Sequence, residues 1–391
     1  MQKIKRCAVL MHRFRAFILS ILLSDHKGVR ALQKTRIAWL DIARSFAIFS
    51  VIVVHCTERI YSMDFDKLQT MGVFSPMFRN VLFTVGRIGV PLFLMITGYL
   101  LLDRDFSSSK KIFSFYKHNL LPLIVTAEMW ILIYAARYFI TGEGGYTVAD
   151  MIGDMLFIRP HNMGHMWYVP LIIGFYIAVP FIANAIRKVS SKVLAVPVLL
   201  VFVTVFLFQF YGIFQNAFDL PFTVTRQVDV SFLGGTYGIY LIAGALCKRG
   251  VLKKIPTAVV LLISVASFAV MALFIFFMMR AGYDYHLWYD FPFLFLCAFC
   301  LFELFSRINT KRALVKKGIP VTAAISSVSF GMYFMHVPLL RDILKYFEAM
   351  DINNPLKTLI YIAVVFTVSF VLSFLLSKIP VVKRLLFNIK K

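Results

Sequence analysis

The segment RSFAIFSVIVVH, residues 44–55, places an arginine and a histidine at the two ends of an apolar run. A guanidinium group binds phosphate oxygens through paired hydrogen bonds, and an imidazole gains or loses a proton near neutral pH. In a helix, eleven residues separate Arg44 and His55 by about 16 Å and bring both to within about 20° of one face. The spacing therefore predicts an anion-binding group at one end of a helix and a base or nucleophile at the other.

The separation is on the scale of an extended phosphopantetheine arm, so acyl-CoA could place its phosphates near Arg44 and its thioester near His55. Asp41 shares a helical face with Arg44 and is expected to orient it. Glu58 lies about one turn beyond His55 and is a candidate to orient the imidazole. Two structural alternatives remain open: His55 as a hydrogen-bonding histidine between packed helices, and Glu58 as a solvated acid in a loop.

The elements that must hold these residues are membrane-spanning helices. Of the 391 residues, 60% are hydrophobic and 16% are charged, whereas soluble domains average about 45–50% apolar residues. Apolar runs of about 17–25 residues can cross a bilayer as helices. We therefore predict an all-α integral membrane protein with about ten transmembrane helices, at 38–57, 81–102, 119–140, 166–186, 193–214, 231–247, 256–279, 287–305, 322–343 and 358–377.

Basic residues indicate how these helices are oriented. Thirty of the 42 Lys and Arg residues lie in the N-terminal segment, in alternate loops and in the tail from Lys378. The positive-inside rule then places both termini in the cytoplasm. The net charge of +23 is thus a signal of membrane topology, and no nucleic-acid partner is expected. We predict a multi-pass protein of the bacterial cytoplasmic (inner) membrane, in contact with membrane lipid.

Residues 1–35 are predicted to form a basic extension that precedes a ten-helix domain at 36–391. The extension fits an interfacial amphipathic helix, and the alternatives are a cleaved signal peptide or a dispensable segment from an upstream start. Among the five cysteines, Cys297 and Cys300 form a C-x-x-C motif, but no second pair or histidine follows at metal-ligand spacing. We predict packed thiols, no metal site and no permanently bound cofactor.

Three further motifs combine polar groups with apolar helices. GRIGVPLFLMITGYLLL at 86–102 contains Arg87, and a charge within a membrane span is costly and commonly functional. HMWYVP at 165–170 has an aromatic pair that belongs either to a site or to an interfacial belt. SFGMYFMHVP at 329–338 has polar groups that either line a site or pack in the core. The candidates in these two motifs are Trp167, Tyr168, Ser329, Tyr333 and His336.

Taken in order, these motifs resemble those of the integral-membrane acyltransferases of family 3, from about Thr35 to Lys383. The hallmarks are L-D-x-x-R with a histidine eleven residues after the arginine, R-x-x-V-P-L-F-x-x-x-[ST]-G-Y-L, and S-[YF]-G-x-Y-x-x-H. The H-x-W-[YF] start of the fourth helix is similar to the branch that contains the enterobacterial common antigen O-acetyltransferase. The matching residues of the three hallmarks are Leu40, Asp41, Arg44, His55, Arg87, Val90, Pro91, Leu92, Phe93, Thr97, Gly98, Tyr99, Leu100, Ser329, Phe330, Gly331, Tyr333 and His336.

The resemblance implies an O-acyltransferase, most commonly an O-acetyltransferase, that uses cytoplasmic acyl-CoA as its co-substrate. The implied acceptor is a hydroxyl of an extracytoplasmic or lipid-linked surface polysaccharide. His55 is implied to be catalytic, and Arg44 and Arg87 are implied to contact acyl-CoA. The chemistry of His55 stays open between a general base and an acyl-imidazole relay. Arg87, Tyr333 or backbone amides beside Gly89 are candidates to stabilise the oxyanion.

The sequence also leaves two other functions open, and it ranks His55 above His336 as the catalytic histidine. The chain could instead be a transporter or flippase for a glycan or small anion, or a sensor domain that binds its ligand without chemistry. Transporters commonly carry inverted repeats, and we find none in the sequence. His336 is expected to matter less than His55, because nothing in its spacing aligns it with a donor arm.

Overall fold

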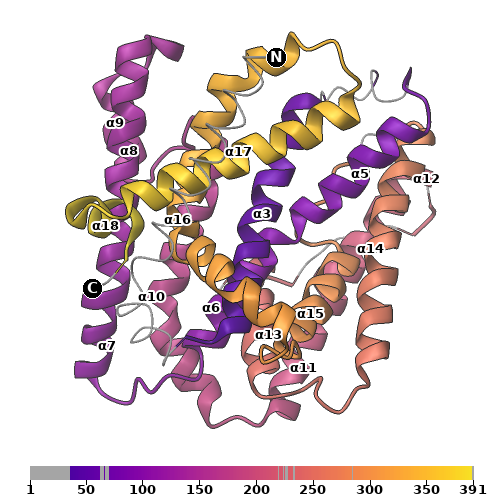
Figure 1. The fold of residues 1–391 in the computed structure, drawn as a ribbon. Helices are drawn as coiled ribbons and strands as arrows, with labels where there is room; N and C mark the ends of the chain where they lie inside the picture. The colour runs from indigo at the N-terminus through magenta and orange to yellow at the C-terminus, as the bar shows by residue number, and fades with distance from the viewer. Residues whose placement is uncertain are drawn as a thin grey trace. The chain divides into compact units, whose positions relative to one another are not determined.

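The computed structural model describes residues 36–61, 66, 70–218, 220–222, 224, 228–231, 234–283 and 285–389. Within these ranges the chain is helical and contains no strand, which confirms the all-α prediction. The predicted extension at 1–35 lies outside the described residues, and Trp39–Lys391 form one compact unit. The helices, drawn in Figure 1, are α3 Ala38–Ile60, α5 Phe74–Arg87, α6 Gly89–Leu101, α7 Ser109–Phe115, η1 Tyr116–Leu120, α8 Leu121–Thr141, η2 Glu143–Gly145, α9 Val148–Met155, η3 Gly164–Trp167, α10 Tyr168–Arg187, α11 Ser191–Val201, η4 Phe202–Leu207, α12 Phe208–Phe218, α13 Thr236–Lys248, α14 Thr257–Arg280, α15 Pro292–Ser306, α16 Ala313–Glu348, α17 Asn354–Leu376 and α18 Pro380–Phe387.

Eight helical segments in the described part of the chain are long and apolar enough to cross a membrane. They are residues 38–60, 74–101, 109–141, 164–187, 191–218, 257–280, 313–348 and 354–376. The other two predicted spans correspond to α13 and α15, with 13 and 15 residues. Both are shorter than the roughly 17 residues that a bilayer requires. The protein is therefore a multi-pass membrane protein, and the predicted count of ten is not confirmed.

Helix α3 is enclosed by protein on most sides, whereas α11 and α12 are not. In the most apolar window of α3, 72% of residues are buried, compared with 17% in the window from Ser191 to Phe218. A helix that is apolar all round and still exposed in the protein presents its side chains to lipid. Four polar residues of α3 are buried in the protein interior, where the cost of burying them has to be offset by partners: Asp41, Ser45, Ser50 and Thr57.

Glycines allow the start of the second span to approach α3 closely. A Cβ atom at Gly86 would overlap Val54 of α3, and a Cβ at Gly89 would crowd the carbonyl oxygen of Ala47. The two glycines flank the break between α5 and α6, at Ile88. Because no side chain separates the backbones, this break lies directly against α3.

Two more glycines bring α6 and α13 into backbone contact. A Cβ at Gly98 would overlap the carbonyl oxygen of Leu241, and a Cβ at Gly244 would overlap that of Met95. Small residues that permit such an approach are typical of helix pairs in membranes, where van der Waals contact between helices replaces the hydrophobic effect. This pair fixes α6, which forms one wall of the pocket described below.

The C-terminal helix α18 lies across α8 and α16 (Figure 1). The indole nitrogen of Trp130, in α8, donates a hydrogen bond of 2.9 Å to the carbonyl oxygen of Leu386. Phe387 is buried, and its ring occupies the space that a side chain at Gly331 of α16 would need. These contacts hold the end of the chain against the core of the bundle.

Candidate active site

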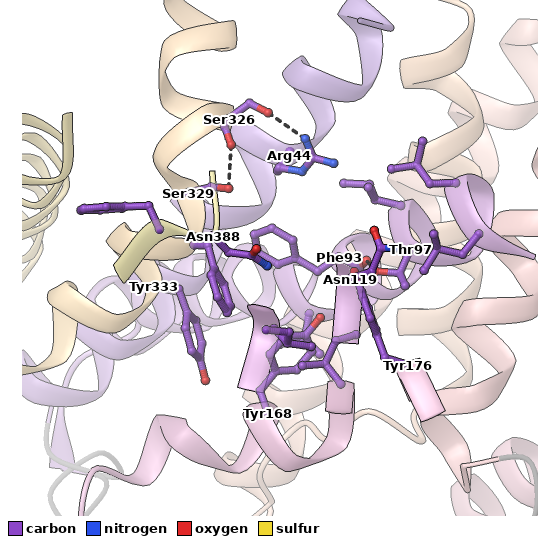
Figure 2. A pocket seen from close by; sticks show the side chains of 18 of the residues that line it. Arg44, Phe93, Thr97, Asn119, Tyr168, Tyr176, Ser326, Ser329, Tyr333 and Asn388 are labelled. Carbon is purple, nitrogen blue, oxygen red and sulfur yellow. Dashed lines mark hydrogen bonds between the residues drawn. The ribbon is translucent and has the colours of Figure 1, made fainter. Parts of the chain in front are cut away.

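A cavity of about 360 Å³ lies between α3, α6, α8, α10 and α16. Its volume is within the range of small-molecule sites, about 300–1,000 Å³. Figure 2 shows Arg44 and Ser326 on one side of this pocket and the rings of Tyr168 and Tyr333 on the opposite side. Asn388, directly after α18, completes the lining. The pocket therefore has a cationic, polar end and an aromatic end.

Arg44 is held at the polar end by a bridge between α3 and α16. Its guanidinium donates to Ser326 Oγ at 3.0 Å (Figure 2). Ser326 in turn donates to Asp41 Oδ1 at 2.6 Å. Asp41 also lies 3.8 Å from the guanidinium and is buried. The predicted pairing of Asp41 with Arg44 is therefore present, with a serine between them that the sequence did not reveal. About a quarter of the Arg44 side chain (27%) stays accessible for an anionic ligand.

Tyr333 and Tyr168 form the aromatic end of the pocket. Their rings lie 5.9 Å apart, and both side chains are almost fully buried. The Tyr333 hydroxyl donates to the backbone carbonyl of His165, so its proton is already engaged in this structure. An oxyanion role for Tyr333 would require that bond to break, which makes Tyr333 a weaker candidate than Arg87.

His55 and Glu58 lie beyond this end of the pocket, one to two turns along α3 from Val51. His55 Nδ1 is 3.2 Å from Glu58 Oε2, and Glu58 Oε1 is 3.6 Å from a guanidinium nitrogen of Arg87. A carboxylate can only accept, so Nδ1 carries a proton, and in the neutral form of the ring Nε2 presents its lone pair. Glu58 is thus placed to orient His55, and about a quarter of each side chain remains accessible.

Arg87 occupies a box of aromatic rings. Its guanidinium carbon lies 4.6 Å from the ring centroid of Phe83, 4.8 Å from that of Trp288 and 5.6 Å from that of Tyr289. Cations are attracted to the faces of such rings. Arg87 does not line the pocket that contains Arg44. It contacts Glu58, and Glu58 in turn contacts the imidazole of His55.

Three imidazoles from three different helical segments meet at this point. The ring centroid of His55 is 5.3 Å from that of His336 and 6.5 Å from that of His165, and the last two are 5.2 Å apart. The ring of Tyr333 lies 5.2 Å from His165 and 6.0 Å from His336. The histidine cluster, His55 with His165 and His336, is therefore adjacent to the aromatic end of the pocket.

His336 was expected to matter less than His55, because its spacing in the sequence did not align it with a donor arm. The structure places the two side chains next to each other, so this reason no longer holds. His336 is fully buried beside His55 rather than remote from it. His165 was not among the sequence candidates, although the H-x-W-[YF] motif begins with it. Trp167, by contrast, packs on Tyr237 and Tyr289 and does not line the pocket, while Ser329 does.

A second polar cluster lies between α9 and η3. His161 Nδ1 accepts a hydrogen bond from the backbone nitrogen of Met163, and its Nε2 lies 3.4 Å from the buried carboxylate of Asp154. Burial, together with the positive charges of Arg159 and Arg341, lowers the pKa of His161 to about 4. Burial also raises the pKa of Asp154. His161 is therefore neutral at physiological pH.

The family model for an acyltransferase domain, number 3, matches residues 37–377. The chain belongs to acyltransferase family 3. Neither the curated proteins nor the solved structures give a match. The resemblance found in the hallmarks is confirmed at the level of the family, and the finer resemblance to one branch remains a prediction. Because it belongs to acyltransferase family 3, the protein is a membrane acyltransferase.

Proposed function

We propose that this membrane acyltransferase moves an acyl group from cytoplasmic acyl-CoA to a hydroxyl of an extracytoplasmic or lipid-linked surface polysaccharide. Acetyl-CoA is the proposed donor and is a co-substrate rather than a resident cofactor. The transfer takes place in the cytoplasmic membrane of a bacterium. Membership of an acyltransferase family favours this enzyme over the transporter, flippase and sensor that the sequence left open.

The observation that carries the proposal is the arrangement of Arg44, the pocket and the histidine cluster along α3. Arg44 supplies a guanidinium for the phosphates of acyl-CoA. The pantetheine arm would then lie in the pocket, with the thioester at the end formed by Tyr168 and Tyr333. His55 is about 16 Å from Arg44 along the helix, so the reacting carbon and the base would meet there.

The proposed reaction is a substitution at the thioester carbon. His55 Nε2 takes the proton of the acceptor hydroxyl as the hydroxyl oxygen attacks the carbonyl carbon. The carbon–sulfur bond then breaks, and the proton passes from His55 to the departing CoA thiolate. Glu58 keeps the imidazole in the tautomer that this requires. The positive charge of Arg87 stabilises the developing oxyanion. We assign Arg87 this role, rather than contact with the nucleotide phosphates of acyl-CoA, because Arg87 lies beside Glu58 and the phosphates would lie near Arg44.

An alternative route through the same residues begins with attack by His55 itself. Nε2 would take the acyl group as an acyl-imidazole and release CoA before the acceptor binds. Mass spectrometry of protein quenched after mixing with acetyl-CoA alone separates the routes. A mass increment of one acetyl group on the peptide that contains His55 identifies the covalent relay, and its absence during turnover identifies the direct route.

The experiment that tests the proposed function is transfer of radiolabelled acetyl from acetyl-CoA in membranes matched for protein level. His55→Ala should lower the rate by at least about 10²–10⁴-fold, the usual contribution of a general base. His118→Ala is the matched control, because His118 is exposed on η1 and its Nδ1 lies within hydrogen-bond distance of Ser114 in the preceding helix α7. Near-normal transfer by His55→Ala would refute the catalytic role.

The acceptor is identified by glycan mass spectrometry in cells with and without the gene. Loss of an acetyl mass increment from a surface saccharide, restored by the wild-type gene and not by His55→Ala, is the expected result. An unchanged glycan profile would argue against a polysaccharide acceptor.

A further inference from the structure

Two buried nitrogens of the histidine cluster lack a partner among the described residues. They are Nδ1 of His165 and Nε2 of His336. The residues are 3% and 0% exposed, and their rings lie 5.2 Å apart. A buried polar atom without a hydrogen bond is destabilising. Two such atoms on neighbouring rings, next to the proposed base, indicate a place for a ligand.

The hydrogen bonds of His336 fix which of its nitrogens is the acceptor. Nδ1 lies 2.6 Å from the carbonyl oxygen of Tyr333 and 3.2 Å from that of Met332. Carbonyl oxygens only accept, so Nδ1 carries the proton of the neutral ring. Nε2 then presents a bare lone pair.

The same reasoning applies to His165. The hydroxyl of Tyr134 donates to the carbonyl oxygen of Phe334 at 2.6 Å, so its oxygen is free to accept. His165 Nε2 lies 3.4 Å from that oxygen and is the donor in the consistent tautomer. Nδ1 of His165 is therefore the second bare lone pair.

In its neutral form His55 adds a third acceptor, because Nδ1–H then points to Glu58 and Nε2 carries a lone pair. The histidine cluster thus offers three hydrogen-bond acceptors, which are His55 Nε2, His165 Nδ1 and His336 Nε2, and none of these atoms is a donor. The ligand must supply hydrogen-bond donors. No group of three His, Cys, Asp or Glu residues within the described ranges could hold a metal ion. A cationic ligand is disfavoured by the positive charge of Arg87, whose guanidinium lies 3.6 Å from the Glu58 carboxylate that His55 contacts.

We infer that His336 and His165 bind hydroxyl groups adjacent to the one that reacts at His55, so that the acceptor is recognised as a polyol with neighbouring hydroxyls. Neutral hydroxyls donate without bringing charge into a buried site. Adjacent hydroxyls of a saccharide ring are close enough to reach neighbouring imidazoles. This inference deepens the proposed function and rests on it: the reacting hydroxyl gives its proton to His55, and its neighbours only donate hydrogen bonds.

The test compares two small acceptors that differ by one hydroxyl, cis-1,2-cyclohexanediol and cyclohexanol. Acetyl transfer from labelled acetyl-CoA is measured for purified full-length protein, and kcat/KM is determined for each alcohol. The wild type should prefer the diol by about 5- to 150-fold, the range expected when one buried acceptor is left unpaired. In His336→Phe, which keeps an aromatic ring and removes the acceptor, this ratio should fall toward one.

Tyr361→Phe is the matched control for packing around α16. The Tyr361 hydroxyl donates to the carbonyl oxygen of Leu340, one turn beyond His336, and is also buried. Its removal should leave the diol preference as in the wild type. A preference lost equally in Tyr361→Phe and His336→Phe would overturn the inference, because general loosening of α16 would then explain it.

The outcomes separate the two proposals. Equal use of both alcohols by the wild type, or a preference kept in His336→Phe, overturns the polyol inference and leaves the transferase intact, with bound water as the partner of the nitrogens. Transfer to no acceptor, including membrane glycan, refutes the proposed function instead. In that case the inference is tested by the Tm of the protein with each alcohol. The diol should raise the Tm of the wild type more than cyclohexanol does, and this difference should be absent in His336→Phe. Equal Tm shifts with the two alcohols in the wild type would overturn the inference.

Discussion

Replacing Glu58 with glutamine tests whether its carboxylate controls the tautomer of His55. Glutamine keeps the shape of the side chain and an oxygen that can accept from Nδ1 at the 3.2 Å distance. It removes the negative charge, and with it the ion pair with Arg87 at 3.6 Å. The change therefore isolates the electrostatic part of the contact.

The magnitude follows from the kind of hydrogen bond that is lost. A bond to a charged group contributes about 1.5–3 kcal/mol and a neutral bond about 0.5–1.5 kcal/mol. The difference of about 1–1.5 kcal/mol corresponds to a fall in kcat of about tenfold for Glu58→Gln. Glu58→Ala loses the whole bond and should lower kcat by about 10- to 150-fold.

The assay is the initial rate of acetyl transfer at saturating and limiting acetyl-CoA. We expect kcat to fall while KM for acetyl-CoA changes little, because Arg44 and the pocket lie at the other end of α3. Glu348→Gln, at the exposed end of α16, is the matched control and should retain full activity. A normal kcat in Glu58→Gln, with unchanged Tm, would refute the idea that the carboxylate positions the imidazole.

Three further predictions follow from the helix contacts, the pocket and the second polar cluster. Gly244→Ala should destabilise the protein by about 1–3 kcal/mol, because its methyl group would overlap the backbone of α6; an unchanged Tm would show that α6 and α13 can separate freely. Arg44→Lys should weaken acetyl-CoA binding by about tenfold in calorimetry, because lysine keeps the charge and loses the paired donors; unchanged affinity would leave Arg44 as a partner of Asp41 alone. The pKa of His161 is about 4, against 6.5 for the free side chain, so unfolded protein takes up a proton that folded protein does not. Stability should therefore fall as pH drops from 6.5 toward 4, by on the order of 3 kcal/mol at most. His161→Asn should flatten that dependence of Tm on pH, and an equally steep fall in the variant would assign the effect to other groups.

The sequence predicted local features well, because they depend on periodicity and length. Apolar runs located the eight long helices of the described residues. The eleven-residue spacing in α3 put Arg44 and His55 on one helix, with Arg44 lining the pocket and His55 beyond it, and their roles in one site remain a prediction. The predicted spans at 231–247 and 287–305 are not confirmed, because α13 and α15 are apolar but short in the structure. Hydropathy reports whether a segment can lie in lipid, and it does not report where the helix ends.

Tertiary partners could not be read from spacing within one helix. Ser326 joins Arg44 to Asp41 from a position 282 residues beyond Arg44, and serine in an apolar helix carries no signal of such a bond. His165 and His336 reach His55 only because η3 and α16 pack against α3. The motifs contained both histidines, but only the packing shows that all three rings form one cluster.

The contacts of α16 also bear on membrane topology. Ser326 meets Arg44 near the start of α3, and His336 meets His55 near its end, so the two helices run parallel. Parallel spans are separated by an odd number of crossings between them. If α13 and α15 both cross, seven spans intervene, and if neither crosses, five do, so the parity is odd in either case. If both short helices cross or neither does, the predicted placement of both termini on one side is therefore unaffected. In both cases His55 and His336 lie at the same level of the membrane.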